Sequence, residues 1–395
     1  MISVDEAQKI IAEKTSPLDS EQVRLEESLD RVLREAVAAD TDQPPFDRSA
    51  MDGYAIRADD PSENFKIIAV IQAGDAPAFS LRPGECARIF TGAQIPQNTG
   101  AVIRQEDTIA KENSMRITAR SKETHIRKRG EDVQAGSELL PPGHLLGPVH
   151  LSVMAGVGHT RVKVSRKPRV LHLSSGNEIV APDRMPEPGQ IRDSNSILVK
   201  SLVEKAGGEI VGQLHAGDRL DEIIRIARSF AQPYDILLFS GGASVGDFDY
   251  AATTLEQLGF TLHFRQVNVR PGKPLIFATN GRQIAFGLPG NPVSHFVTFH
   301  LFVRPALRAM LGLTQAEMEL VGAHLGCDYD EPPNPRETYA PAQWFYADGI
   351  QNHVKPLAWQ SSGHLASLIS ATGLLRIPAN SPLIKKGDIV QVFTI

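Results

Sequence analysis

A continuous apolar run at residues 236–239 constrains the fold of this 395-residue chain more than any other stretch. The run has no polar alternation, which is typical of a strand buried on both faces, as in the parallel sheet of an α/β domain. It ends in the glycine-rich segment 240–246, and a helical pattern follows at residues 250–258. A glycine-rich turn between a strand and a helix exposes backbone N–H groups near the positive helix end, which favours an anion such as phosphate. Taken alone, Gly241 and Gly242 are equally compatible with a simple tight turn.

Strands and helices alternate along residues 163–316, which predicts a doubly wound parallel sheet with helices on both faces. The expected strands lie at residues 170–173, 209–214, 236–239, 262–269, 275–278 and 284–288. In an open parallel sheet, ligands bind outside the carboxyl ends of the strands. Polar, glycine-containing turns follow four of the strands, at residues 174–178, 217–218, 240–249 and 289–292. We expect these turns to project to one edge of the sheet and to form a ligand site there.

Several residues near this edge suit a phosphate or another anion. Gly241, Gly242 and Ser244 can cradle a phosphate through backbone N–H groups and a hydroxyl. Arg270 and Lys273 stand three residues apart on a stiff Pro-Gly-Lys-Pro frame that limits their freedom. Hydrogen bonds to charged groups contribute about 1.5–3 kcal/mol each, so two cations and a few amides suffice to hold an anionic ligand.

Three carboxylates, those of Glu178, Asp218 and Asp249, are expected at the same edge and would repel a phosphate. Mg²⁺ is typically held by one or two carboxylates together with substrate phosphate oxygens, so a magnesium ion would resolve this conflict. A structural role is equally compatible with two of them. Asp249 could be only an acid at a helix N-terminus, and Asp218 could be only part of an Asx turn.

The segments outside this α/β domain follow other patterns. Ser3 has the spacing of a helix cap, and a second helix is expected at residues 26–38 because apolar residues recur on one side. Short strand patterns at residues 61–129 predict a small β-rich module. The residues after Gly312 predict a β-barrel-like domain, with Trp359 in its core.

Composition excludes several classes of function. The formal net charge is −5, so the chain has no global basic field for nucleic acid. Cys86 and Cys327 are distant in sequence and match no metal or redox spacing, so a reducing compartment is expected. The first residues carry acids rather than a basic and apolar leader, and no apolar run reaches about 18 residues. We therefore expect a soluble cytoplasmic protein with no nucleic-acid partner and no membrane partner.

Seven motifs that follow one another along nearly the whole chain carry a resemblance to a known family. They are SAMDGYA at 49–55, TGA at 91–93, RKRGED at 127–132, SGNE at 175–178, SGGASVG at 240–246, PGKP at 271–274 and LPGNPVS at 288–294. In these motifs and in their order the chain resembles the MoeA / gephyrin E-domain family, the molybdopterin molybdenumtransferases.

The resemblance implies an elongated homodimer whose protomers have four domains. A mixed α/β dimerisation domain would comprise residues 1–43 and 132–162, and a β-rich inserted domain would comprise residues 44–131. Residues 163–316 would form a doubly wound, MogA-like molybdopterin-binding domain, and residues 317–395 a C-terminal β-barrel-like domain. The active cleft would lie on the α/β domain and would be closed by the partner subunit.

The resemblance also implies the reaction. Adenylylated molybdopterin and molybdate would give the molybdenum cofactor and AMP in the presence of Mg²⁺, and a molybdopterin adenylyltransferase would be the upstream partner. Asp52, Thr91 and Asp132 would belong to the partner-side wall of the cleft, whereas Glu178, Asp218 and Asp249 would position the substrate and the cation. The substrate-binding residues would be Ser175, Gly176, Gly241, Gly242, Ser244, Pro289, Asn291 and Pro292, with Arg270, Lys273 and Ser362 meeting molybdate or the dithiolene end.

The chain departs from the family pattern at three positions. Gln266 and Arg270 each stand where a lysine is common, and Pro341 stands where an arginine is commonly a molybdate contact. Because the arginine is lost at Pro341, a non-catalytic pterin-binding or scaffolding relative is an alternative to the enzyme. A molybdopterin adenylyltransferase is a second alternative, but it leaves the β-rich insertion and the C-terminal domain without a role.

Overall fold

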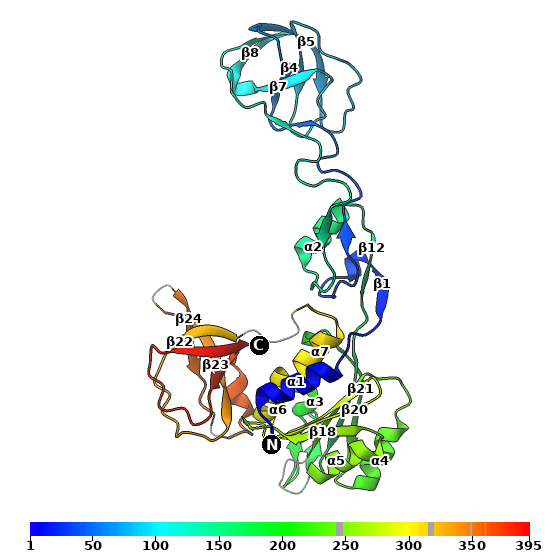
Figure 1. Ribbon diagram of the computed structural model, residues 1–395, viewed down its shortest axis with the longest axis vertical. Helices are drawn as coiled ribbons and strands as arrows, with labels where there is room; N and C mark the ends of the chain where they lie inside the picture. The colour runs from blue at the N-terminus through cyan, green and yellow to red at the C-terminus, as the bar shows by residue number, and fades with distance from the viewer. Residues whose placement is uncertain (242–247, 315–319, 348–349, 360) are drawn as a thin grey trace. The chain divides into compact units, whose positions relative to one another are not determined.

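The computed structural model describes residues 1–395 except 242–247, 315–319, 348–349 and 360 (Figure 1). Within the helices and strands that border these gaps, the side chains of residues 248–249, 346–347 and 350–351 are not described either. The chain forms two compact units. Unit 1 comprises residues 1–34, 142–147 and 162–395, and unit 2 comprises residues 35–141 and 148–161.

A six-stranded sheet forms the centre of unit 1. Its strands lie in the order β16 (Glu209–Ala216), β13 (Arg169–Ser175), β17 (Ile236–Gly241), β21 (Gln283–Leu288), β20 (Pro274–Asn280) and β18 (Thr261–Gln266). The first four are parallel, whereas β20 and β18 are antiparallel to their neighbours. The predicted doubly wound sheet is therefore parallel over four strands and antiparallel at one edge. The reason is a tight hairpin between β20 and β21, in which Gly281 has a positive φ of 59°.

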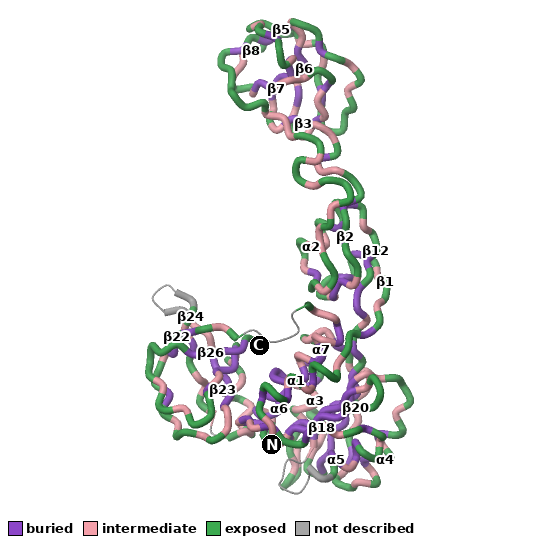
Figure 2. Tube along the Cα trace, viewed as in Figure 1, coloured by how far each residue is buried: buried purple, intermediate pink, exposed green. Residues whose placement is uncertain are grey.

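Helices cover both faces of this sheet, as expected for a doubly wound fold (Figure 1). On one face, Ile236 and Leu238 pack in a core shared with α1 (Val4–Lys14), α3 (Asn195–Lys205), α6 (Pro292–Thr298), the π-helix η3 (Phe299–Val303) and α7 (Arg304–Met310). On the other face, Leu237 and Phe239 pack against α4 (Leu220–Ser229) and α5 (Phe248–Gln257). The apolar run at residues 236–239 is thus buried on both sides, as Figure 2 shows for the strands of the sheet.

The N-terminal part of unit 1 departs from its expected pattern. The side chain of Ser3 accepts a hydrogen bond from the N–H of Glu6 and caps α1, as predicted. The prediction of a second helix at residues 26–38 is wrong, because only the short 3-10 helix η1 (Leu25–Glu27) forms there. Val32 and Leu33 are fully buried, but they form β-bridges to Leu145 and Val164 instead. Two small two-stranded sheets accompany the main sheet, β1 (Ser20–Arg24) with β12 (Arg161–Ser165) and β14 (Ile179–Val180) with β15 (Ile191–Arg192).

The C-terminal part of unit 1 is a closed five-stranded barrel, as predicted from the sequence. It consists of β22 (Leu320–Leu325), β23 (Glu337–Ala347), β24 (Ile350–Pro356), β25 (Gly373–Ile377) and β26 (Ile389–Thr394), with η4 (Leu365–Leu368) in a connection. The order β23–β24–β22–β26–β25 is closed by pairing of β25 with β23. The short strand β19 (Val269–Arg270) pairs with β23 from outside the barrel. This pairing brings the segment after β18 beside the first residues of β23.

Unit 2 is rich in β-structure, as predicted. Its main sheet has the order β7 (Thr99–Arg104), β4 (Gly53–Arg57), β6 (Glu85–Ile89), β5 (Asn64–Ile71), β9 (Ser114–Ile117) and β8 (Thr108–Lys111), and η2 (Gln105–Asp107) follows β7. Smaller elements are the pairs β3 (Arg48–Ser49) with β10 (Ile126–Arg127) and β2 (Val37–Ala38) with β11 (Glu138–Leu140), and helix α2 (Pro148–Gly156). In the described residues of both units, no helix is long and apolar enough to cross a membrane.

Candidate functional site

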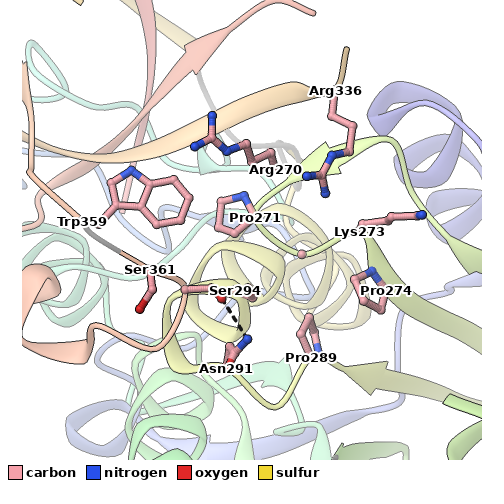
Figure 3. A pocket seen from close by; sticks show the side chains of 12 residues that line it. Arg270, Pro271, Lys273, Pro274, Pro289, Asn291, Ser294, Arg336, Trp359 and Ser361 are labelled. Carbon is pink, nitrogen blue, oxygen red and sulfur yellow. Dashed lines mark hydrogen bonds between the residues drawn. The ribbon is translucent and has the colours of Figure 1, made fainter. Parts of the chain in front are cut away.

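A cationic cavity of about 340 Å³ opens in unit 1 between the α/β domain and the barrel. Arg270, Lys273 and Arg336 line it together with the polar side chains of Asn291 and Ser362. Figure 3 shows the three cationic side chains in the upper half of the view and Asn291 below them. The segment after β18 supplies two of the cations, and the residue before β23 supplies the third. Pairing of β19 with β23 therefore assembles this cavity from two distant segments.

The backbone around Gly272 determines where Arg270 and Lys273 lie. Gly272 has a φ of +104°, and a Cβ at this position would lie 2.4 Å from Cγ2 of Thr298 in α6. Only glycine satisfies both the conformation and the close approach to the helix. The Arg270–Pro271 peptide bond is cis. The Pro-Gly-Lys-Pro frame expected from the sequence therefore lies directly against α6.

The three cations of the cavity differ in how they are neutralised. Arg270 pairs with Glu331 at 2.9 Å, and its guanidinium stacks over the ring of Trp359 at 5.5 Å. Arg336 donates from Nη1 to the carbonyl oxygen of Val269 at 3.4 Å. Within the described residues, no carboxylate lies within 4.0 Å of the ammonium of Lys273 or the guanidinium of Arg336. These two groups are available to a bound anion, and a planar guanidinium can hold two of its oxygens.

A second cavity of about 370 Å³ lies at the carboxyl ends of β13 and β17, where the sequence predicts the ligand site. We call it the strand-end cavity. A Cβ on Gly241 would lie 2.1 Å from Oγ of Ser175, so the close approach of β17 to β13 requires glycine. The predicted site residues that line it are Ser175, Glu178, Gly241, Asn291 and Pro292. The predicted residues Arg270, Lys273, Pro289, Asn291 and Ser362 line the cationic cavity.

Asn291 lines both cavities. It occupies the N-cap position of α6, with Pro292 in the first turn as the sequence predicts. Its side chain does not cap the helix, and Nδ2 instead donates to Oγ of Ser362 at 2.8 Å. This bond ties the turn after β21 to the segment that follows the barrel strand β24. The two cavities are therefore adjoining parts of one site.

The carboxylates expected to hold a cation lie in two neighbouring loops. Asp218 accepts a hydrogen bond from the N–H of Asn177 at 2.9 Å, and Asn177 Oδ1 accepts one from the N–H of Asp218 at 3.2 Å. These bonds join the loop after β16 to the loop that carries Glu178. Gly176, with a φ of +151°, leaves open the space beside Glu178, because a Cβ there would lie 2.8 Å from Oε2. Glu178 lines the strand-end cavity and Asp218 lies in the neighbouring loop, and carboxylates are ligands that Mg²⁺ uses together with phosphate oxygens.

Three predicted site residues lie wholly or partly outside the described part of the chain. Gly242 and Ser244 lie outside the described residues, and so does the side chain of Asp249, which belongs to the first turn of α5. In the described part of the chain, no three His, Cys, Asp or Glu side chains form a complete metal cluster.

Three predicted site residues belong to unit 2. Asp52 Oδ1 accepts hydrogen bonds from the N–H of Thr91 at 2.8 Å and from its hydroxyl at 2.7 Å. These bonds lower the pKa of the Asp52 carboxyl below its usual value, the backbone N–H having the larger effect. The structure therefore brings Asp52 and Thr91 together. Asp132 forms an ion pair with Arg127.

Comparisons with known proteins agree with this geometry. The chain matches the models of the MoeA N-terminal region (domain I and II) at residues 2–158, of a probable molybdopterin binding domain at 172–309, and of the MoeA C-terminal region (domain IV) at 325–395. A curated relative from Nostoc sp., named molybdopterin molybdenumtransferase, is 36% identical over an alignment that covers 99% of this chain and 93% of the relative. The chain belongs to the MoeA family.

Other members of the MoeA family are similar along their whole length. A molybdopterin molybdenumtransferase of Staphylococcus aureus (strain Mu50) is 32% identical over an alignment that covers 99% of this chain and 95% of that protein. A crystal structure of a molybdopterin biosynthesis MoeA protein from Pyrococcus horikoshii OT3 matches with a TM-score of 0.85 and 28% identity, and the match covers 100% of both chains.

Two residues of the cationic cavity were not predicted from the MoeA motifs. Arg336 lines the cavity, whereas Pro341, where the family commonly has an arginine, is buried in β23. Trp359, expected in the barrel core, lines the cavity and stacks on Arg270 instead. The pairing of β19 with β23 brings Arg336 to the Pro-Gly-Lys-Pro frame, and no local spacing in the sequence signals it. Because Arg336 supplies a cation here, the loss at Pro341 no longer favours a non-catalytic relative.

Proposed function

We propose that this protein inserts molybdenum into molybdopterin, converting adenylylated molybdopterin and molybdate into the molybdenum cofactor and AMP. The observation that carries the proposal is that a cationic cavity and a strand-end cavity adjoin at Asn291. Such a pair suits a reaction between a small anion and a larger phosphate-bearing substrate. The molybdopterin molybdenumtransferases named above are relatives over nearly the full chain, which supports the same reaction.

Molybdate, a tetrahedral dianion, would bind in the cationic cavity. Lys273 and Arg336 would compensate its charge, because no carboxylate of the described residues lies within ion-pair distance of either group. Arg270, already paired with Glu331, would add weaker attraction and position Trp359. The hydroxyl groups of Ser361 and Ser362 would donate hydrogen bonds to the remaining oxygens.

The adenylylated pterin would bind in the strand-end cavity, with Ser175, Gly241 and Pro292 in its wall. Glu178 and Asp218 would hold Mg²⁺, which neutralises charge on the phosphate oxygens as the bond to AMP breaks. Without the ion, these two carboxylates would repel the substrate. The pterin end would then face the cationic cavity across Asn291.

A change of charge at Lys273 tests this function. Lys273 is exposed at the edge of the sheet, so Lys273→Glu should leave the fold intact and lower molybdate-dependent AMP release by at least about tenfold. The measurement is AMP release from adenylylated molybdopterin with and without molybdate. Lys200→Glu is the matched control, since Lys200 is an exposed residue of α3 and lines neither cavity. A folded wild-type protein that releases no AMP in response to molybdate would overturn the proposal.

We also propose that the protein works as a cytoplasmic homodimer and receives its substrate from a molybdopterin adenylyltransferase. Helix α2 of unit 2 supports a dimer, because Val149 and Val153 are 72% and 40% exposed and lie one turn apart on the same side. In this proposal Asp52, Thr91 and Asp132 of one protomer would complete the site of its partner.

A further inference from the structure

A buried histidine lies beneath the strand-end cavity. His172 in β13 has no exposed surface, and its Nε2 is within hydrogen-bond distance of Oγ of Ser240. Ser240 stands near the carboxyl end of β17 and lines the cavity, although only 3% of its surface is exposed. The serine therefore has one side toward the imidazole and the other toward a ligand. If Nε2 of His172 donates to Oγ of Ser240, the serine hydroxyl is free to donate to the ligand; if Oγ donates to Nε2, it can only accept from the ligand.

Gln213 in β16 determines which nitrogen of His172 carries the proton. Its Nε2 donates to the carbonyl oxygen of Ser196 at 2.8 Å, and only the amide nitrogen can make that bond. The same nitrogen lies 3.5 Å from Nδ1 of His172. A donor therefore faces Nδ1, and this ring nitrogen must accept. The remaining ring nitrogen, Nε2, carries the hydrogen.

The imidazole of His172 is neutral at ordinary pH. Burial lowers its pKa to about 4, although the nearby carboxylate of Asp193 acts to raise it. A neutral imidazole has a single N–H, which here donates from Nε2 to Oγ of Ser240. The hydroxyl hydrogen of Ser240 then remains unused. In the described part of the chain, His172 is the only hydrogen-bond partner of this hydroxyl.

We propose that His172 is a positioning residue that fixes the hydroxyl of Ser240 as a hydrogen-bond donor into the strand-end cavity. The donor would select a ligand with an acceptor at this place, such as a phosphate oxygen or a carbonyl oxygen. This inference rests on the proposed function, in which the adenylylated pterin occupies the cavity and supplies both kinds of acceptor. Ser175 and Asn291 line the strand-end cavity together with Ser240.

The first experiment determines which ring nitrogen of His172 carries the hydrogen, and it needs no ligand. The full-length protein is labelled with ¹⁵N in its histidine rings, and long-range ¹H–¹⁵N spectra are recorded at pH 7. His172 is assigned by the loss of its signals in His172→Leu. We expect a neutral ring with hydrogen on Nε2. A charged ring, or a neutral ring with hydrogen on Nδ1, would overturn the proposal even if the protein inserts molybdenum.

The second experiment measures binding of molybdopterin under anaerobic conditions. His172→Leu and Ser240→Ala should each weaken binding by at least about fivefold, the effect of one hydrogen bond. The double variant should bind no more weakly than either single variant, because both remove the same bond to the ligand. Ser240→Thr keeps the hydroxyl, and His172→Gln keeps a donor, so each should retain most of the affinity.

The matched control is a second histidine–hydroxyl pair in the same sheet. His263 Nε2 lies 2.8 Å from Oγ1 of Thr279 on β18 and β20, and neither residue lines a cavity of the site. His263→Leu should therefore bind molybdopterin like the wild type. Unchanged affinity in a folded Ser240→Ala, or additive losses in the double variant, would overturn the role of this pair. A wild-type protein that binds no molybdopterin would instead overturn the proposed function.

Discussion

At the scale of single residues, the two cysteines differ in their surroundings. Cys86 is completely buried in the core of the unit 2 sheet, and this burial raises the pKa of its thiol to about 12. Cys327 is exposed. Because the thiolate is the reactive form, we expect iodoacetamide at pH 8 to label Cys327 and to leave Cys86 unmodified in the folded protein.

Mass spectrometry of the labelled peptides measures this difference. Labelling in urea should modify both cysteines, which provides the control for reagent access. Rapid modification of Cys86 under native conditions would contradict the buried position of this residue.

Single residues of the site were predictable from the sequence only where their role depends on neighbouring residues in the chain. The glycines and the Pro-Gly-Lys-Pro frame could be located from the sequence, because turn chemistry depends on adjacent residues. Gly272 and Gly241 do stand where a Cβ would collide with a neighbour. The role of Arg336 could not be predicted, since the residue reaches the cavity only through pairing of β19 with β23. Contacts between distant segments leave no local pattern to read.

At the scale of elements, Asp235 joins the starts of β13 and β17. Its carboxylate accepts two hydrogen bonds from Arg166, each 2.7 Å long, and one from the N–H of Arg169 at 2.8 Å. Burial acts to raise the pKa of Asp235, but these bonds outweigh burial and hold the pKa below its usual value. A carboxyl whose pKa is lower in the folded state stabilises that state above its unfolded pKa. The contribution is lost as the pH falls through the folded pKa.

We therefore expect Asp235→Asn to lower the free energy of unfolding by about 2–3 kcal/mol at pH 7. The difference from the wild type should shrink below about pH 4, where the wild-type carboxyl takes up a proton. Urea unfolding of both proteins as a function of pH measures this. Asp221→Asn is the control, because Asp221 forms an exposed pair with Arg219 and should change stability little. An equal loss for the two variants would contradict the structural role of Asp235.

The elements themselves were predictable to different degrees. The strand at residues 236–239 could be predicted because burial on both faces gives a continuous apolar run. The prediction of a second helix was wrong because Val32 and Leu33 belong to an apolar pattern with helical spacing. In the structure both residues are buried in extended backbone that forms β-bridges to Leu145 and Val164. The antiparallel edge was missed because strand direction depends on the hairpin at Gly281 and not on the pattern within β20.

At the scale of the whole molecule, the proposed homodimer leads to a prediction about helix α2. Val149 and Val153 form an exposed apolar stripe on a helix that otherwise buries Met154. In a homodimer this stripe would be covered, so Val149→Asp with Val153→Asp should give monomers. Sedimentation equilibrium measures the mass of the wild type and the variant.

Ile109→Asp is the control, since Ile109 is an exposed apolar residue of unit 2 that lies on β8 rather than on α2. A variant of α2 that sediments with the same mass as the wild type would contradict this interface. If dimers are needed for the reaction, the monomeric variant should also lose AMP release while its thermal unfolding stays unchanged.

The position of Asn291 in the walls of both cavities has a consequence for kinetics. The side-chain amide of Asn291 donates a hydrogen bond to Ser362. A ligand that reorients this amide from one cavity therefore changes the wall of the other cavity as well. The two substrates should then influence each other's affinity, and thermodynamic reciprocity requires the same factor in both directions. Initial rates should accordingly be measured as a function of one substrate at several fixed concentrations of the other. In double-reciprocal plots the lines should cross off the horizontal axis, because the affinity for one substrate then depends on the concentration of the other.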